Sequence, residues 1–292
     1  MLKICYCEED DIDFIRWTSN LLHKFLLNGS IEIVEKKNNP DLMLASVWRK
    51  HELPNELPIV LVSNENWRLW PGHYPPSIYS AIIAITPPAI KTAFVAYTPP
   101  PFISYPYEIV HFGNSYDALA NKRAKLIKRE KKKFCCFVVS NATYGDLAQK
   151  RYEIFSKINA YKQVDSAGRA HNNVGYFAPK GDDFLEWISE YKFMICPENS
   201  NFPGYITEKA LQAYIAGTIP IYCGGNQDIL NDNAYIDASK EDYLSKIITI
   251  DQNETALTSM LSESLYKKAP SLHSFEEKFE KLIKEFESRQ PQ

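Results

Sequence analysis

The chain has 292 residues, 45% of them hydrophobic and 24% charged, and a net charge of −3, a globular composition that leaves little room for extended disorder. Its length exceeds that of one compact core, so we expect two domains of about 130 to 150 residues each, with room for a cleft between them. No stretch approaches the roughly 18 to 20 uninterrupted apolar residues that cross a bilayer, and the first residues, MLKICYCEEDD, lack a secretory signal pattern.

The first part of the chain alternates between strand-like and helix-like patterns. Short apolar runs at 2–6, 31–34, 42–47 and 59–62 predict buried strands, and apolar residues at helical spacing predict a helix over 12–26. From Trp67 to Pro106 prolines recur, which predicts a loop-rich region. Its aromatic residues either stack on sugar faces or fill a small core, and both interpretations stay open.

A basic run joins the two halves. Residues 122–133 contain eight lysines and arginines against one acidic residue, Glu130. We interpret the run as a solvated helix or linker that enters the second domain. No aromatic residue lies between the charges to stack on bases, so we expect no nucleic-acid partner. A weak, salt-sensitive attraction to a membrane surface stays open.

The second part predicts a parallel sheet wrapped by helices. Strands are expected at 134–139, 193–196 and 219–222, and helices at 147–158, 184–191 and 207–216. We therefore expect an amino-terminal domain at 1–125, a second domain at 126–265, and a tail at 266–292 whose helix, 275–286, docks on the body through one apolar face. Ligands of such sheets bind at the carboxyl ends of the strands.

The six cysteines indicate a reducing compartment. They lie mostly in apolar runs and show no C-x-x-C spacing typical of a zinc or redox site. We expect them to be reduced, in a cytoplasmic protein that either stays free or associates peripherally with the inner face of a membrane. The cysteines are Cys5, Cys7, Cys135, Cys136, Cys196 and Cys223.

The most informative segment is 191–225. A buried strand ends in Glu198 and Asn199, and a loop then leads to a helix opened by Thr207, a sound N-cap residue. The positive end of that helix favours an anion, and a diphosphate fits there. Lys209, in the first turn, would neutralise the anion, and Glu208 can accept hydrogen bonds from a ribose diol.

Together with the following TIPIYCGG, this segment resembles the signature of the α1,3-fucosyltransferase family, glycosyltransferase family 10. That signature runs F-E-N-S/T, then D/G-Y-V/I-T-E-K, a helix, and V/I-P-I/V-x-x-G. FCCFVVSN at 134–141 with Arg151 downstream, VDSAGR at 164–169, and LVSNENW at 61–67 are similar to further family segments, although Asn64 stands where glycine is usual. Pro197 departs from the aromatic residue common at its position.

The resemblance implies an α/β fold of the GT-B type, with two Rossmann-like domains facing a central cleft, the acceptor in the first and GDP-fucose in the second. Each site residue is carried over by motif. Arg151 and Lys209 would bind the diphosphate, Glu208 the ribose and Tyr205 the nucleotide; Glu198 and Asn199 would lie near the fucose and its phosphate, and Glu65 would be the general base.

The implied reaction is inverting transfer of L-fucose to a hydroxyl of a glycan that contains GlcNAc or Glc, in α1,3 linkage, with an N-acetyllactosamine or lipopolysaccharide-type acceptor. Arg151, Lys209 and the helix N-terminus would replace the divalent metal of other transferases, so no cofactor is expected besides the donor. Asp11-Ile12-Asp13 matches a metal-binding Asp-x-Asp by letters, and we interpret it as a helix cap. Two alternatives remain: the same fold with another GDP-sugar, or a catalytically silent protein that binds nucleotide sugars or glycans.

Overall fold

The computed structural model describes residues 1–6, 15, 18–19, 22, 27–46, 57–63, 81–84, 102–104, 116–140, 143, 145–201, 205–225, 227–270 and 273–288. The chain divides into two compact units, Met1–Gly113 with Ser271–Gln292, and Asn114–Pro270. The boundary therefore lies ahead of the predicted 125/126, which would cut helix α3, Tyr116–Leu126. That helix packs on α6 (Glu208–Ile215), so it belongs to the second unit.

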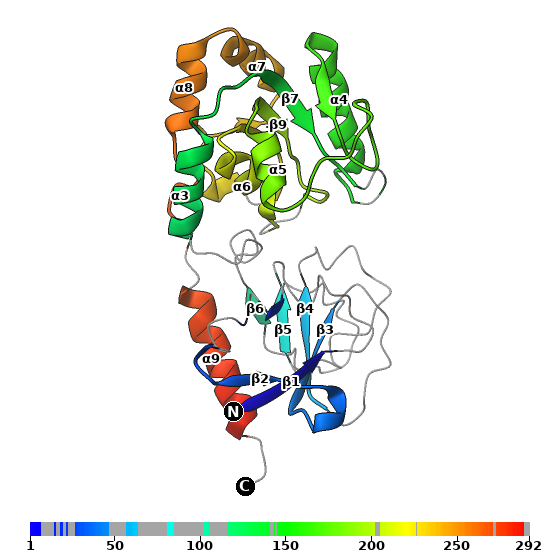
Figure 1. Ribbon diagram of the computed structural model, residues 1–292, viewed down its shortest axis with the longest axis vertical. Helices are drawn as coiled ribbons and strands as arrows, with labels where there is room; N and C mark the ends of the chain where they lie inside the picture. Colours follow the sequence, from blue (N-terminus) through cyan, green and yellow to red (C-terminus); the bar gives the residue numbers. More distant parts are fainter. Residues whose placement is uncertain are drawn as a thin grey trace, which may run out of the picture. The chain divides into compact units, whose positions relative to one another are not determined.

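The first unit contains a parallel six-stranded sheet in the order β2-β1-β3-β4-β5-β6 (Figure 1). Its strands are β1 Leu2–Tyr6, β2 Ile31–Ile33, β3 Leu42–Ser46, β4 Ile59–Ser63, β5 Ala81–Ala84 and β6 Phe102–Ser104, and a short 3-10 helix spans Lys36–Asn38. The first four confirm the strands expected from the apolar runs. The last two lie in the region predicted to be loops, because its prolines flank the short apolar stretches AIIA and FIS and do not interrupt them. The helix expected at 12–26 lies mostly outside the described residues.

The carboxy-terminal helix α9, His273–Ser288, completes the first unit (Figure 1, red). It contacts β1 and β6, and its apolar face is buried. The buried side chains include Phe275 and Phe279, whose rings stack at 5.6 Å between centroids. The amphipathic tail predicted from the sequence is thus a helix whose apolar face packs inside the protein.

The second unit is a parallel five-stranded sheet in the order β11-β10-β9-β7-β8, with helices between its strands. Its strands are β7 Lys133–Phe137, β8 Val164–Ser166, β9 Tyr191–Ile195, β10 Ile219–Tyr222 and β11 Ile236–Asp237. Its other helices are α4 Ala148–Tyr161, α5 Asp182–Ile188, α7 Tyr243–Asp251 and α8 Glu254–Ser262, with a 3-10 turn at Gln227–Ile229. The expected strands and helices are confirmed, except that the helix expected at 184–191 ends at Ile188 and residue 191 opens β9. The short strands β8 and β11 and the helices α7 and α8 are additional.

The register of this sheet brings three loops together at one edge. Ile195 of β9 lies opposite both Phe137 of β7 and Ile221 of β10. Because parallel strands share their direction, the segments that follow these residues emerge side by side. The ladder continues past the strands, where the Glu198 N–H donates to the Cys223 carbonyl at 2.9 Å.

The described cysteines are free and buried, as expected for reduced core residues. Burial raises the pKa of the thiols of Cys135, Cys136 and Cys196 well above the ordinary value, so they stay protonated at neutral pH. Cys7 lies outside the described residues. In the same described ranges, no helix has both the length and the apolar character needed to span a membrane.

The basic residues of 122–133 form ion pairs and a cation–π contact within the second unit. Its charges find acidic partners on and around α5, in the pairs Lys122–Asp182, Arg129–Glu186 at 3.1 Å and Lys133–Glu190 at 3.0 Å. Arg123 is buried, with its guanidinium 3.7 Å above the ring of Tyr214. The run thus contains a helix end and a linker that enter the second unit, as interpreted, but it is not solvated throughout, because Arg123 is buried.

A buried carboxylate ties three elements of the second unit together. Asp251, at the end of α7, accepts hydrogen bonds from Lys162 and Lys192, both at 2.9 Å, and from the Tyr161 hydroxyl at 3.1 Å. Burial alone would raise the pKa of the Asp251 carboxyl, but these three hydrogen bonds outweigh it and hold the pKa below its usual value. The carboxylate therefore joins the end of α4 and the start of β9 to α7.

Asp251→Asn should lower the free energy of unfolding at pH 7 by about 2 kcal/mol, because two ammonium groups lose their carboxylate. Lys162 is half-exposed, so water would replace part of its interaction. The pKa of the Asp251 carboxyl is lower in the folded protein than in the unfolded chain, where it is about 4. The carboxylate therefore stabilises the fold at any pH above about 4, and this stabilisation is lost as the pH falls through the folded pKa. Urea unfolding at pH 7, 5 and 3.5 checks this, and a difference between wild type and variant that stayed constant would contradict it.

Candidate functional site

Glu198 stands at the centre of the site, directly after β9 at the carboxyl edge of the second sheet. Its side chain has no exposed surface. The segment that carries it is fixed on both sides by the main chain, because the Glu198 N–H donates to Cys223 and the Glu198 carbonyl accepts from the Arg151 Nε at 3.1 Å. Arg151 lies on α4 and is itself 96% buried, with a relative exposure of 4%.

The Glu198 carboxylate is surrounded by donors from two further segments. Oε1 accepts from the Thr207 N–H at 2.7 Å, and both oxygens lie 2.8 Å from the Thr207 hydroxyl. Oε2 accepts from the Lys209 Nζ at 3.1 Å, and the Tyr222 hydroxyl lies 3.3 Å from Oε1. A buried carboxylate is tolerated only with such compensation. Glu198 thus binds the start of α6 to the end of β10.

Thr207 is the N-cap of α6 by position, as predicted, with an extended backbone at φ −116°. Its side chain makes no capping hydrogen bond, because the hydroxyl lies against the Glu198 carboxylate. The positive end of a helix favours a nearby anion. In this structure the Glu198 carboxylate lies at the entry to α6, where the sequence predicted a diphosphate.

Lys209 follows in the first turn of α6. Its ammonium donates to Glu198 and to the Thr207 hydroxyl, the latter at 2.7 Å, and lies 3.8 Å from the Glu208 carboxylate. Burial would lower the pKa of Lys209, but the Glu198 and Glu208 carboxylates outweigh it and raise the pKa. The ammonium is therefore charged at neutral pH, and its side chain keeps 27% of its surface exposed.

The other predicted site residues differ in exposure. Glu208 opens α6 with 19% of its side chain exposed, whereas Tyr205 is buried at 1%. The Asn199 carbonyl accepts from the Leu147 N–H at 3.1 Å, next to the start of α4. The structure thus brings Arg151, Glu198 and Lys209 together through hydrogen bonds, and Asn199 follows Glu198 in the chain. Their roles toward a ligand remain predictions, and Glu65 lies outside the described residues.

Two site residues had no assigned role in the sequence. Tyr222 appears in the TIPIYCGG segment, and its hydroxyl reaches Glu198. Gly224 follows it, and a Cβ there would lie 2.5 Å from the Tyr222 hydroxyl and 2.8 Å from the Glu198 Cγ. The x-x-G element of the motif therefore has a steric reason, because only glycine leaves room for the Glu198–Tyr222 contact.

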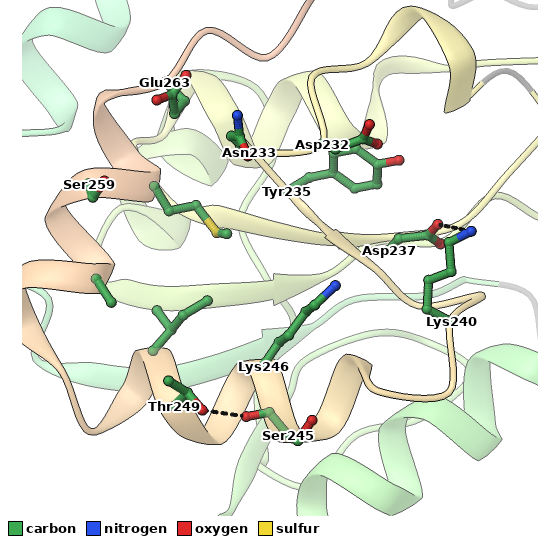
Figure 2. A pocket seen from close by; sticks show the side chains of 13 residues that line it. Asp232, Asn233, Tyr235, Asp237, Lys240, Ser245, Lys246, Thr249, Ser259 and Glu263 are labelled. Carbon is green, nitrogen blue, oxygen red and sulfur yellow. Dashed lines mark hydrogen bonds and ion pairs between the residues drawn. The ribbon is translucent and has the colours of Figure 1, made fainter.

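The described residues also form a cavity of about 640 Å³ that contains none of the predicted site residues (Figure 2). It lies against β11, α7 and α8. Lysines on its rim have acidic neighbours, with Lys246 3.2 Å from Asp242 and Lys240 3.9 Å from Asp237. Among the described residues, no three His, Cys, Asp or Glu side chains gather as a metal site; Asp11 and Asp13 lie outside this part of the chain.

Comparison with solved structures identifies the class of fold. The crystal structure of an α1,3-fucosyltransferase with GDP-fucose superimposes with a TM-score of 0.68 over 97% of this chain and 90% of that chain, at 21% sequence identity. The two parallel-sheet units have the GT-B type of fold, as the resemblance predicted.

The sequence of the second unit is similar to one protein family. Residues 128–266 match the model described as glycosyltransferase family 10 (fucosyltransferase) C-term. A protein of Acanthamoeba polyphaga mimivirus is 33% identical over 153 residues, 47% of this chain and 25% of that protein. An α-(1,3)-fucosyltransferase of Helicobacter pylori is 38% identical over 107 residues, 37% of this chain and 20% of that protein. The second unit is thus similar in sequence to glycosyltransferase family 10, and the matched part spans a quarter or less of these relatives.

Gly224→Ala should destabilise the protein by about 1 to 3 kcal/mol, because the added methyl group overlaps the Tyr222 hydroxyl. Tyr222→Phe removes that hydroxyl and one hydrogen bond to Glu198, at a cost of about 1 kcal/mol. The double variant should be more stable than the sum of the two costs predicts, since the shortest of the overlaps is relieved, although those with the Glu198 Cγ at 2.8 Å and the residue 222 Cζ at 2.9 Å stay. Urea unfolding of all four proteins measures this coupling, and strictly additive costs would contradict the steric explanation.

Proposed function

We propose that this chain transfers L-fucose from GDP-fucose to a hydroxyl of a GlcNAc- or Glc-containing glycan, in α1,3 linkage and with inversion at the anomeric carbon. The observation that carries the proposal is the cluster of Arg151, Lys209 and Glu198 at the start of α6, inside the region that matches family 10. The Helicobacter pylori relative, named an α-(1,3)-fucosyltransferase, and the similar fold solved with GDP-fucose support this donor.

The cluster suits a diphosphate leaving group. As the bond between the anomeric carbon and the phosphate oxygen breaks, its electron pair passes to GDP and negative charge grows there. Preorganised cations and helix N–H groups stabilise such charge without reorganising. Lys209 and Arg151 are held at the start of α6 and in α4 beside it, and Glu208 presents a partly exposed carboxylate that can accept hydrogen bonds from a ribose diol. In this proposal the protein supplies the neutralising charge and needs no metal ion.

Glu65 is proposed as the general base, on its N-E-N motif alone. It would take the proton from the acceptor hydroxyl while that oxygen attacks the anomeric carbon from the face opposite the leaving GDP. Pro197, which is buried beside Glu198, stands where the family commonly has an aromatic residue. Another GDP-sugar is therefore the second donor to test, by competition against GDP-fucose.

Lys209→Ala should weaken GDP binding by about tenfold to a hundredfold, the loss expected for a charge-assisted hydrogen bond to phosphate. Calorimetric titration with GDP measures this. Mass analysis of lactose and N-acetyllactosamine incubated with GDP-fucose measures transfer, with and without excess chelator. Transfer should persist in chelator, and a strict manganese requirement would contradict neutralisation by the protein's own cations.

Glu65→Gln should abolish transfer and leave GDP affinity nearly unchanged, because the amide keeps the shape of the side chain but cannot accept the proton. The same two assays separate the effects. Near wild-type turnover would show that another group is the base. Tight GDP binding by the wild type without any transfer would favour a silent binding protein.

A further inference from the structure

Glu198 is in contact with both proposed phosphate-binding cations. Its side chain holds the ammonium of Lys209 at 3.1 Å, and its main-chain carbonyl holds the Nε of Arg151 at 3.1 Å. The two cations lie on different helices, α6 and α4. Glu198 thus links the two cations directly.

The Glu198 carboxylate is badly placed to bind a ligand itself. It has no exposed surface, and both oxygens already accept hydrogen bonds within the protein. A carboxylate also repels a diphosphate, so direct contact would weaken donor binding. The presence of a buried carboxylate at this position is therefore not explained by contact with the ligand.

We propose that Glu198 is a positioning residue, whose carboxylate fixes Lys209 and the start of α6 and whose carbonyl fixes Arg151, so that the two cations are preorganised for a nucleoside diphosphate. The inference rests on the proposed function and assigns Glu198 a role behind the cations, in place of the predicted contact with the fucose.

The contacts around Glu198 restrain the parts of the site that would otherwise move. A lysine side chain is a flexible chain of four carbons and loses considerable conformational entropy when it is ordered. Here the Glu198 carboxylate and the Thr207 hydroxyl order the Lys209 side chain before a ligand binds. The start of α4 is bound to the same segment, because the Leu147 N–H donates to the Asn199 carbonyl. Gly145, at φ +99°, permits this approach, since a Cβ there would lie 1.9 Å from the same carbonyl oxygen.

Tyr222 supports the carboxylate from the sheet side. Its ring is fully buried and packs edge-to-face on Tyr235, 6.2 Å between centroids, so the hydroxyl that reaches Glu198 is rigidly held. Three separate motif segments, P-E-N-S, Y-I-T-E-K and I-Y-C-G-G, thus meet at one carboxylate. Tyr222→Phe offers a mild perturbation of Glu198 that leaves its charge unchanged.

Glu198→Gln separates positioning from charge. If the carboxylate acted through its charge alone, the neutral amide would remove a repulsion and GDP would bind more tightly. If it positions Lys209, the amide presents an N–H toward the ammonium, Lys209 is released, and GDP binds more weakly. We expect GDP affinity to fall about tenfold, measured by calorimetry.

The effect should pass through Lys209. In a double-mutant cycle, Glu198→Gln should add little to Lys209→Ala, because the released side chain is already absent. Tyr222→Phe should weaken GDP binding by about twofold to threefold, because it removes only the longest of the hydrogen bonds to the carboxylate, at 3.3 Å, and leaves the bond to Lys209 in place. The rate of fucose transfer by Glu198→Gln should fall at low GDP-fucose and stay near that of the wild type at saturating GDP-fucose, so that the variant raises the KM for the donor more than it lowers kcat.

Asp251→Asn provides the matched control, as another buried carboxylate bound by two lysines in the same unit. It should lose stability and keep GDP affinity and the donor KM. The inference would be overturned if the Glu198→Gln variant, shown by circular dichroism to be folded, bound GDP as well as the wild type or better. It would also be overturned if the losses in GDP affinity from Glu198→Gln and Lys209→Ala were additive.

Should Glu198→Gln fail to fold, Tyr222→Phe decides, and unchanged GDP affinity in that variant overturns the inference. The proposed function fails in a different way: the wild type itself would neither bind GDP nor transfer fucose from GDP-fucose. A wild type that does both, with variants that bind GDP normally, leaves the function intact and removes only the positioning role.

Discussion

The buried carboxylate of Glu198 is the constraint on which the site depends. Removing an anion from water is costly unless donors and a cation replace its hydration, and here they come from the start of α6 and the end of β10. The register of β9 on β10 must therefore be right before the carboxylate is satisfied. Stability of the second unit and geometry of the two cations are consequently parts of the same arrangement.

Much of the second unit could be predicted because its elements have distinct patterns. Apolar runs gave β7, β9 and β10, and the parallel sheet followed from helices lying between them. The N-cap position of Thr207 was also predictable, but the direction of its hydroxyl was not, since it depends on a carboxylate nine residues away. Likewise Tyr222 is one aromatic residue among many until pairing with β9 brings it to Glu198. Proline spacing predicted loops around 67–106, and the short strands β5 and β6 escaped that pattern.

The basic run illustrates how charge along the chain differs from charge in space. Read in sequence, residues 122–133 carry a strong positive excess. In the fold, acidic residues some 60 positions later lie beside them, at Asp182, Glu186 and Glu190. Burial with Arg123 and Arg129 nearby even lowers the pKa of Lys131 to about 8. Segment charge alone therefore overstates how strongly this surface would attract an anionic partner.

The first unit is assembled from both ends of the chain, since α9 packs on β1 and β6. During synthesis the strands of that unit leave the ribosome early, yet their covering helix emerges only after the whole second unit has been made. The second unit is continuous in sequence and can close its core while translation proceeds. The first unit therefore keeps the part of its apolar surface that α9 covers exposed until synthesis is nearly complete.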